Sequence, residues 1–433
     1  MQIFRRPIPA FAAAFLFMAV PYSFGAGFAI VEQSASSIGS AFSDNGAATD
    51  DPSAMYFNPA GMSAVEGSEL TLGGHVIMPT FEFNNSGSAF LPAGLPVSGG
   101  DGGNGGEAAF VPNAYYKADA NDKAAWGIGI TAPYGLTTEY DSSWVGRYHA
   151  IKTELINLNI NPGVSYKISD KVAVGAGVSA SYVEADLTSA IDFGTILGIA
   201  PQALDGRARI EGDDWAAGCN LGLLITPREE CALSLSYRSK IEHTLEGDAS
   251  FQVPGPARAL QAMNMFVNTS GKADLTLPQT AAIGLAHTFA KKFTAMADVM
   301  WTGWSDFDEL RVKYGSSQPD SVTDESWEDT WRYALGLQYQ HTDKLALRIG
   351  GAYDETPVPD AAHRTPRIPD ADRTWLSLGA GYRLNENLSI DLGYTHLFIN
   401  DSRVQMLGTT GDYLNGSYEG SVDIASIQAS WKF

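Results

Sequence analysis

The histidines and serines of this chain show no arrangement that is typical of an enzyme. The seven histidines are scattered over the 433 residues, at positions 75, 149, 243, 287, 341, 363 and 396. The sequence contains no GxSxG, HExxH or phosphate-binding glycine motif. A serine hydrolase needs a histidine beside its serine, and His243 and Ser239 could be arranged so, although nothing else marks them. We therefore expect no catalytic residue, no metal site and no cofactor.

Positively charged side chains could instead bind an anionic group. Arg238, Arg332, Arg348 and Arg383 fall on the polar face of segments with a period of two. Arginine binds carboxylates through strong, charge-assisted hydrogen bonds. The alternative is that these arginines pair with acids on the same face, such as Asp391. The formal net charge of −21 excludes binding to nucleic acid through phosphate neutralisation.

The two cysteines, Cys219 and Cys231, make neither a disulfide framework nor a metal cage. They flank a short polar turn at residues 227–230, at unequal distances. In a tight hairpin they would lie roughly 20 Å apart along the strands, which is too far for a disulfide bond. We expect no disulfide between them.

The first 25 residues have the features of a secretory signal peptide. Two arginines near the start precede an apolar run at residues 10–20, and Ser23 and Gly25 offer small residues for cleavage. The alternative, a retained membrane helix, needs a longer apolar run. We expect a mature chain that begins near Ala26. No later segment approaches the roughly 18–20 apolar residues of a spanning helix.

From about Glu69 onward, apolar residues recur at every second position. In residues 156–166, isoleucine, leucine, valine and tyrosine share one face, while three asparagines and a serine share the other. The same alternation is found in residues 172–182, 376–384 and 425–433. Successive strand residues point to opposite faces of a sheet. The pattern predicts strands with one greasy and one polar face, as in a soluble β-sandwich or an outer-membrane barrel.

The connections between these strands favour the barrel. Transmembrane barrels have short periplasmic turns and long external loops, whereas a sandwich has no reason to sort its connections. The short turns lie at residues 119–123, 169–171, 227–230, 290–292, 342–344 and 385–387, and alternate with long segments at 84–106, 135–150, 189–206, 251–271, 315–325, 356–370 and 400–416. The count predicts an all-β fold, an antiparallel transmembrane barrel of about 14 strands.

Aromatic side chains near the short turns fit the girdle that such barrels place at the membrane interface. They are Tyr166, Phe289, Phe293, Tyr339, Tyr382 and Phe433. The alternative is ordinary β-propensity, which also enriches tyrosine and phenylalanine. A sheet in lipid must close, because each unpaired backbone group in hydrocarbon costs several kcal/mol.

Residues 26–66 differ from the strands that follow. They are rich in alanine, serine and glycine, their apolar residues have irregular and partly helical spacings, and they end in a rigid Asn-Pro-Ala-Gly turn. A compact segment ahead of a long sheet indicates a plug inside the barrel. We therefore expect a signal peptide at residues 1–25, a small and partly helical N-terminal hatch in the lumen at 26–66, and the barrel at 67–433.

Three stretches resemble the FadL-type (OmpP1/FadL/TodX) long-chain fatty acid transporters of Gram-negative outer membranes. They are the mature start at residues 26–28, the Asn58-Pro59-Ala60 tripeptide, and the strand-to-loop stretch at residues 134–140. The resemblance covers the whole mature chain. The terminal Phe433 also resembles the signal that the barrel-assembly machinery reads.

The resemblance implies a 14-stranded barrel, a hatch, and passive uptake of hydrophobic molecules that leave sideways at a kinked third strand. In this chain the kink would involve Gly129, Pro133 and Gly135; the alternative is that the proline merely ends its strand. Phe28 matches the hatch residue that reaches the binding pocket, or else is an ordered apolar anchor. Asn58, Pro59 and Ala60 would fix the hatch to the wall near the kink.

Two long external segments carry apolar residues at helix-like spacings. A large exposed apolar patch normally marks a binding groove, and methionine suits loosely shaped ligands. Such a groove would capture a greasy molecule, unless the two loops bury these residues against each other. The residues are Ile191, Phe193, Ile196 and Leu197 in one segment and Met263, Met265 and Phe266 in the other.

The substrate implied by the resemblance is a long-chain fatty acid, whose carboxylate would meet one of the four arginines in the lumen. The expected fifth strand, however, ends in the acids Glu184 and Asp186, which do not favour a bound carboxylate. Neutral alkanes and monoaromatics are therefore alternative substrates. A polar diffusion porin is a more distant alternative, because it needs no hatch. We expect a monomer in contact with outer-membrane lipid and lipopolysaccharide; acidic loop runs such as residues 320–329 are either solvated or bridged to lipopolysaccharide by divalent cations.

Overall fold

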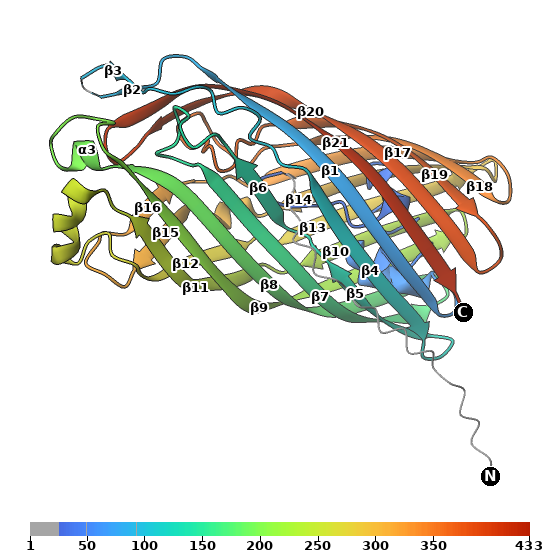
Figure 1. Cartoon of the computed structure of the whole chain (residues 1–433). Helices are drawn as coiled ribbons and strands as arrows, with labels where there is room; N and C mark the ends of the chain where they lie inside the picture. Colours follow the sequence, from blue (N-terminus) through green and yellow to red (C-terminus); the bar gives the residue numbers. More distant parts are fainter. Residues whose placement is uncertain (1–25, 49, 92) are drawn as a thin grey trace, which may run out of the picture.

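The computed structural model describes residues 26–48, 50–91 and 93–433, so the expected signal peptide lies outside it. The described chain forms a closed antiparallel barrel of 14 strands (Figure 1). The barrel closes where β1 (Glu69–Asn85) pairs along its whole length with β21 (Asp412–Lys432). This confirms the barrel that the alternating pattern and the sorted connections together predicted. None of the described helices is long and apolar enough to cross a membrane.

Several of the 14 wall strands are interrupted and carry two labels. From β1 onward the wall consists of β4 (Ala109–Asp119), β5 (Ala124–Thr131) with β6 (Gly135–Glu139), β7 (Lys152–Ser169), β8 (Val172–Asp192), β9 (Asp205–Arg228), β10 (Cys231–Arg238) with β11 (Ile241–Gln252), β12 (Thr269–Leu277) with β13 (Thr280–Phe289), β14 (Phe293–Thr302) with β15 (Glu309–Tyr314), β16 (Ser321–Asp324) with β17 (Thr330–Gln340), β18 (Leu345–Asp354), β19 (Arg373–Arg383), β20 (Leu388–Leu407) and β21. The short β2 (Ala89–Phe90) and β3 (Leu95–Pro96) extend the external end beside β21.

The two faces of the wall follow the alternation in the sequence. On β7 the side chains of Asn157, Asn159 and Asn161 are buried inside the barrel, whereas Val164 is 58% and Tyr166 50% exposed on the outside. Outward apolar side chains suit hydrocarbon, and inward polar side chains find partners in the lumen. Two of the expected girdle residues, Phe289 and Tyr382, likewise lie on the outer face near short turns.

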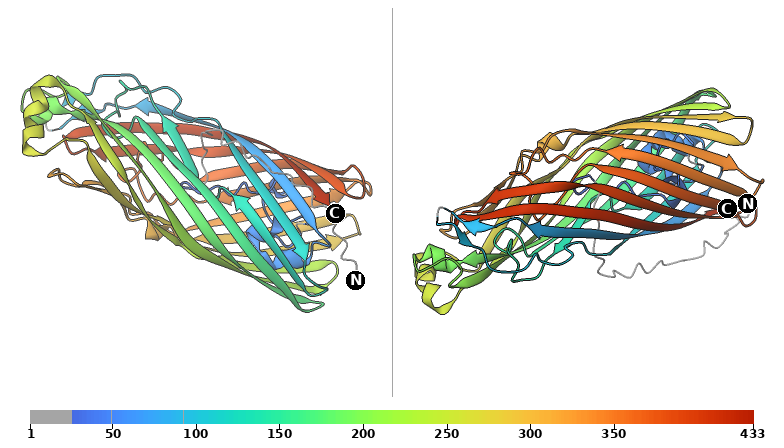
Figure 2. Two further views of the ribbon diagram at one scale, coloured as in Figure 1. Left: turned by 60° about the horizontal axis from the view of Figure 1, so that its bottom comes forward. Right: turned by 90° about the horizontal axis from the view of Figure 1, so that it is seen from above.

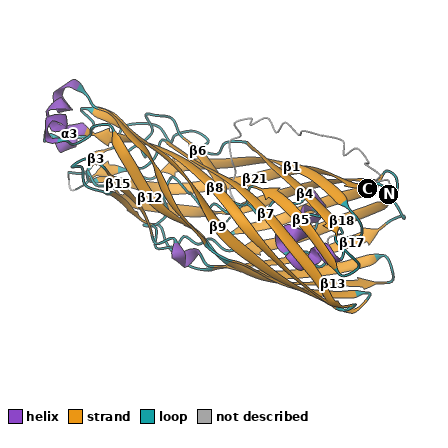
Figure 3. Ribbon diagram, turned by 90° about the horizontal axis from the view of Figure 1, so that it is seen from below, coloured by secondary structure: helices purple, strands orange, loops and turns teal. Residues whose placement is uncertain are grey.

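We call residues 26–66 the N-terminal segment. Its described residues, 26–48 and 50–66, lie inside the barrel toward the end that carries the C-terminus (Figure 2). Their helical turns, α1 (Ala35–Ile38), α2 (Ala54–Phe57) and η1 (Pro59–Ser63), are surrounded by strands (Figure 3). The richness in small residues has a steric reason. A Cβ atom on Gly39 would lie 2.6 Å from the Cα of Gly379 in the wall, so the two backbones can approach only because both residues are glycine.

The prediction of a long loop at residues 400–416 is wrong. The strands β20 and β21 continue through most of it and leave only residues 408–411 as a turn. The turn-like Asn400-Asp401 pair is absorbed by a register shift between Ile399 and Ser402, which is how a β-bulge takes up an extra residue. The strict alternation of short and long connections therefore fails at the last hairpin.

Four neighbouring strands on one side of the barrel are interrupted. They break between β10 and β11, between β12 and β13, between β14 and β15, and between β16 and β17. In the break between β14 and β15 the chain forms η3 (Trp304–Asp306), whose Trp304 side chain is fully buried. These breaks bring wall residues into the lumen toward the N-terminal segment.

Candidate lumen site and its seal

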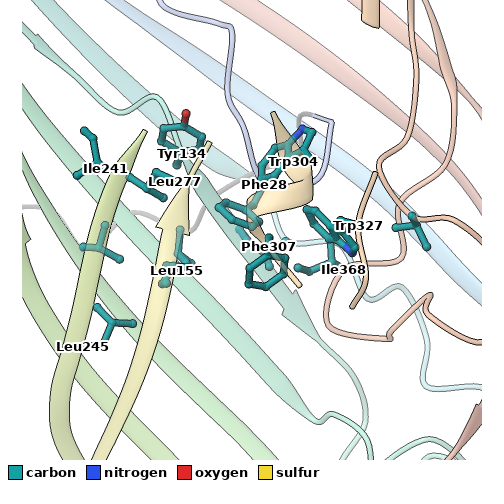
Figure 4. Close-up of a cluster of buried hydrophobic side chains, with 14 of the residues drawn as sticks. Phe28, Tyr134, Leu155, Ile241, Leu245, Leu277, Trp304, Phe307, Trp327 and Ile368 are labelled. Atoms are coloured by element: carbon teal, nitrogen blue, oxygen red, sulfur yellow. The ribbon is translucent and has the colours of Figure 1, made fainter. Parts of the chain in front are cut away.

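The start of the N-terminal segment closes an apolar cavity in the lumen. Phe28 is only 1% exposed, and its ring centroid lies 4.8 Å from that of Trp304 and 5.6 Å from that of Phe307. Trp327 and Tyr134 complete the ring cluster (Figure 4). Beyond Phe28 lies a cavity of about 70 Å³, lined mainly by leucine, isoleucine, valine and alanine side chains from β6 to β15.

The backbone of the N-terminal segment is held at the break in the third strand. The Gly135 N–H donates a hydrogen bond to the Phe28 carbonyl at 2.9 Å, and the Ile30 N–H donates to the Pro133 carbonyl at 2.8 Å. These two bonds flank an antiparallel bridge between Ala29 and Tyr134. The segment thus adds a short strand where the wall strand is broken.

The break itself spans residues 132–134, between β5 and β6. Pro133 has no N–H to give to a ladder. At Ala132 the Gln33 side chain takes the place of a neighbouring strand. Its Nε2 donates a hydrogen bond to the Ala132 carbonyl at 2.9 Å, and its Oε1 accepts one from the Ala132 N–H at 3.2 Å. Gly129 lies within the regular part of β5, opposite Tyr115.

The wall is incomplete beside this break. Residues 109–113 of β4 pair with β1 on one side, but β5 joins β4 only from Ala114 onward. On the other side of the break, β6 pairs with β7 and not with β4. Among the described residues, an isolated bridge between Gly106 and Thr138 joins β6 to the loop ahead of β4. The N-terminal segment therefore lies behind a gap in the strand ladder.

Asn58, Pro59 and Ala60 anchor the N-terminal segment to β8, β9 and β10. The Asn58 Nδ2 donates to the Ser234 Oγ at 2.6 Å and to the carbonyls of Leu223 and Leu235 at 3.1 and 3.2 Å, while its Oδ1 accepts from the Ala60 N–H. A Cβ on wall residues Gly222 or Gly175 would collide with this turn. The tripeptide fixes the segment and does not line the apolar cavity.

The four arginines taken from the sequence do not line the apolar cavity either. Arg238 donates to the Tyr56 carbonyl at 2.8 Å, and Arg332 donates to the Ala41 carbonyl at 2.6 Å, so both hold the N-terminal segment. Arg348 forms an ion pair with Asp391 at 2.6 Å, as the alternative reading of the sequence predicted. The fourth, Arg383, is exposed at the end of β19.

A different arginine lines the cavity, and the sequence reasoning missed it. Arg367 lies in the external connection between β18 and β19, and its Nη1 donates to the Thr153 Oγ1 at 3.1 Å. Glu325, in the break between β16 and β17, lines the same cavity with its Oε2 lacking any hydrogen bond. Burial raises the pKa of Glu325 to about 8 and lowers the pKa of Arg367 to about 10, so Arg367 stays charged at neutral pH.

The apolar loop residues largely bury each other, which was the alternative to an open groove. Phe193 in α3 (Phe193–Ile196) is fully buried against Phe266, with ring centroids 4.9 Å apart. Ile191, Leu197 and Met265 pack around the same cluster. Ile196 and Met263, which is 65% exposed, remain accessible, the latter at the end of η2 (Gly255–Met263).

These features define a class of protein: an outer-membrane barrel whose lumen holds an apolar cavity and a plugging N-terminal segment. Residues 16–433 match the family of outer membrane transport proteins described as OMPP1/FadL/TodX, and the chain belongs to that family. The protein is therefore a transport channel for hydrophobic compounds in the Gram-negative outer membrane, and not an enzyme.

Relatives and solved structures agree with this assignment. The chain is 30% identical over 396 residues to the long-chain fatty acid transport protein of Escherichia coli O6:H1, with 87% of each chain covered. It is 31% identical over 384 residues to the 47 kDa outer membrane protein of Pasteurella multocida, covering 86% of this chain and 87% of that one. The fold matches a Pseudomonas aeruginosa FadL homologue (TM-score 0.89, 24% identity, 94% of this chain and 100% of that chain) and the P. putida toluene transporter TodX (0.67, 21%, 88% and 94%).

Proposed function

We propose that this protein passively transports long-chain fatty acids, and that Arg367 receives the carboxylate. The observation that carries the proposal is a buried guanidinium at the edge of a cavity whose other walls are mainly apolar. The acyl chain would lie against the apolar walls of the cavity, out of contact with water. Its carboxylate would form a charge-assisted hydrogen bond with the Arg367 guanidinium. The E. coli relative named for long-chain fatty acid transport supports the same substrate class.

The size of the cavity implies that the N-terminal segment moves as a hatch. Sites for drug-sized ligands have volumes of roughly 300–1,000 Å³, whereas this cavity measures about 70 Å³. Phe28 forms its floor, and the first residues of the mature chain are the part of the segment that is easiest to displace. We propose that the ligand expels Phe28, breaks the two bonds at the third strand, and leaves sideways through the gap between β4 and β6.

A neutral hydrocarbon is the second candidate substrate. The mainly apolar lining supports it, since Arg367 already has Thr153 and the Lys152 carbonyl as partners. Uptake of radiolabelled oleate, an alkane and toluene, compared between cells with the protein and an empty strain, separates the candidates. Uptake of none of the three would end the transport proposal, and uptake of small sugars instead would favour a polar porin.

Replacing Arg367 tests the carboxylate assignment. We expect Arg367→Gln to weaken oleate binding by about tenfold to a hundredfold, because a hydrogen bond to a charged group is worth roughly 1.5–3 kcal/mol. Binding of an alkane or toluene should change little. Titration of the purified protein in detergent measures both. Arg348→Gln, which removes an arginine outside the cavity, is the matched control, and equal losses for oleate and toluene would contradict the assignment.

The raised pKa of Glu325 predicts a pH effect on the same step. At neutral pH this carboxyl is mostly protonated, so it leaves Arg367 available to the substrate. Above about pH 8 it ionises and competes for the guanidinium. We expect oleate affinity to fall by up to about tenfold between pH 7 and pH 9 in the wild type, and to stay level in Glu325→Gln. Parallel pH curves for the two proteins would refute this competition.

A further inference from the structure

Three arginines line a large polar cavity at the external end of the barrel. The cavity measures about 860 Å³ and lies between the connection after β6, the ends of β8, β9 and β11, and η2. Its arginines are Arg147, Arg207 and Arg258, and Asp205 is the one carboxylate among the described lining residues. This excess of positive charge stands out on a chain with a formal net charge of −21.

One arginine organises the cavity, and the other two are available to a ligand. Arg147 is 6% exposed; its Nε lies 3.0 Å from the Asp205 Oδ2, and its two Nη atoms donate to the carbonyls of Ser98 and Trp144 and to the Tyr148 hydroxyl. The Tyr148 hydroxyl occupies the other Asp205 oxygen at 2.8 Å. The carboxylate is thus neutralised.

Arg207 and Arg258 have no such partners. Neither side chain forms a hydrogen bond or an ion pair with another residue that the structure describes. On β9, Asp205 has the same parity as Arg207 and lies two residues away, but its oxygens are occupied by Arg147 and Tyr148. The next outward acids on β9 and β11 are Glu211, which pairs with Arg209, and Asp248. Each lies four residues along its strand from the arginine row, or about 13 Å.

The strand register places this cavity on the outer face of the wall. Arg207 pairs with Ala190 on β8 and with Gln252 on β11, so the three side chains form one row. Arg207 has the same parity on β9 as Trp215, which is 55% exposed and packs on Tyr182 outside the barrel. Eight residues separate them, or about 27 Å along the strand, so at a tilt of about 40° Arg207 lies about 20 Å further out.

We propose that Arg207 and Arg258, in the cavity that Arg147 organises, form a binding site for phosphate groups on the saccharide of lipopolysaccharide. Guanidinium groups bind phosphate oxygens in bidentate pairs, and two unpaired guanidiniums in a cavity of this size can hold a phosphorylated sugar. Exposed aromatic side chains of such barrels lie at the membrane interface, so a site about 20 Å beyond Trp215 lies at the height of the saccharide and not of the acyl chains. The site shares no lining residue with the transport cavity and does not depend on which substrate the channel carries.

Binding of purified, full-length protein to lipopolysaccharide in detergent tests this site. We expect the Arg207→Ala/Arg258→Ala double variant to bind intact lipopolysaccharide at least tenfold more weakly than the wild type. Enzymatically dephosphorylated lipopolysaccharide should bind the wild type as weakly as the intact form binds the variant. Arg311→Ala, which removes an external arginine that pairs with Glu309 outside the cavity, should leave the affinity unchanged.

A comparison with inorganic phosphate distinguishes a lipid phosphate from free phosphate as the bound anion. Inorganic phosphate alone should bind far more weakly than intact lipopolysaccharide, and equal affinities would overturn the assignment to a lipid. Equal binding by wild type and double variant, or no effect of dephosphorylation, would also overturn it. An unchanged melting temperature and unchanged oleate uptake in the double variant would show that the barrel and the transport path remain intact.

Discussion

The variant Phe28→Ala should bind oleate more tightly than the wild type while unfolding at a lower temperature. Truncating a buried phenylalanine costs about 3–5 kcal/mol of stability, and the four aromatic rings around Phe28 leave little room for collapse. In the wild type, the ligand must first expel this side chain from its apolar contacts. That step costs about 1.5–3 kcal/mol, so its removal should raise the oleate affinity by about tenfold or more.

The opposite signs of the two effects make this prediction specific. Titration with oleate and thermal unfolding of the same detergent-solubilised sample measure both. Phe83→Ala is a matched control, because Phe83 is 2% exposed and packs on Trp144 and Tyr418 in a separate cluster near the external loops. The control should lose stability without gaining affinity. If Phe28→Ala lost affinity together with stability, Phe28 would be a fixed part of the site and not a displaceable seal.

The alternating pattern of the sequence was sufficient to predict the strands and their two faces, because period-two burial is a local property of each strand. The sorting of short and long connections was needed to favour a barrel over a sandwich. The Ala-, Ser- and Gly-rich composition of residues 26–66 likewise indicated a segment packed closely against other backbone, as the contact of Gly39 with Gly379 shows. Both features depend only on residues that are close together in the sequence. They need no knowledge of which distant strands meet.

The site residues depend on long-range packing, and there the sequence was less informative. Arg238 and Arg332 were expected on the inner face, but only the folded chain reveals that carbonyls of the N-terminal segment occupy them. Arg367 lies in an external connection whose apolar and polar residues do not alternate, so its position could not be predicted from the alternation. Its place between Pro366 and Pro369 was the available signal, because prolines restrict how such a connection can fold.

The break that forms η3 shows a second limit. Residues 303–308 contain no proline, and the strand pattern on both sides continues. The backbone leaves the ladder because Trp304 and Phe307 turn inward and pack on Phe28. That contact joins residues almost 280 positions apart, so no local pattern could have predicted it. The same contact couples the N-terminal segment to the wall opposite the third strand.

Locking the N-terminal segment to the third strand should abolish uptake. Ala29 and Tyr134 face each other between the bonds from Ile30 to Pro133 and from Gly135 to Phe28. They therefore form a non-hydrogen-bonded antiparallel pair, with Cα atoms about 4.5 Å apart, which is within the range of a disulfide bond. We expect Ala29→Cys/Tyr134→Cys, made together with Cys219→Ser and Cys231→Ser, to form this bond on oxidation.

The oxidised variant should take up oleate no faster than an empty strain, because the segment can no longer leave the gap beside β4. Reduction should restore uptake in the same cells, which separates the effect of the bond from that of the substitutions. Ser377→Cys/Thr395→Cys in the same background is the control, since it joins two strands that are already paired and whose hydroxyl oxygens lie 2.7 Å apart. That bond should leave uptake unchanged. Undiminished uptake through the oxidised Ala29–Tyr134 variant would mean that the substrate crosses the wall elsewhere, because a covalently fixed segment cannot open the gap that it occupies.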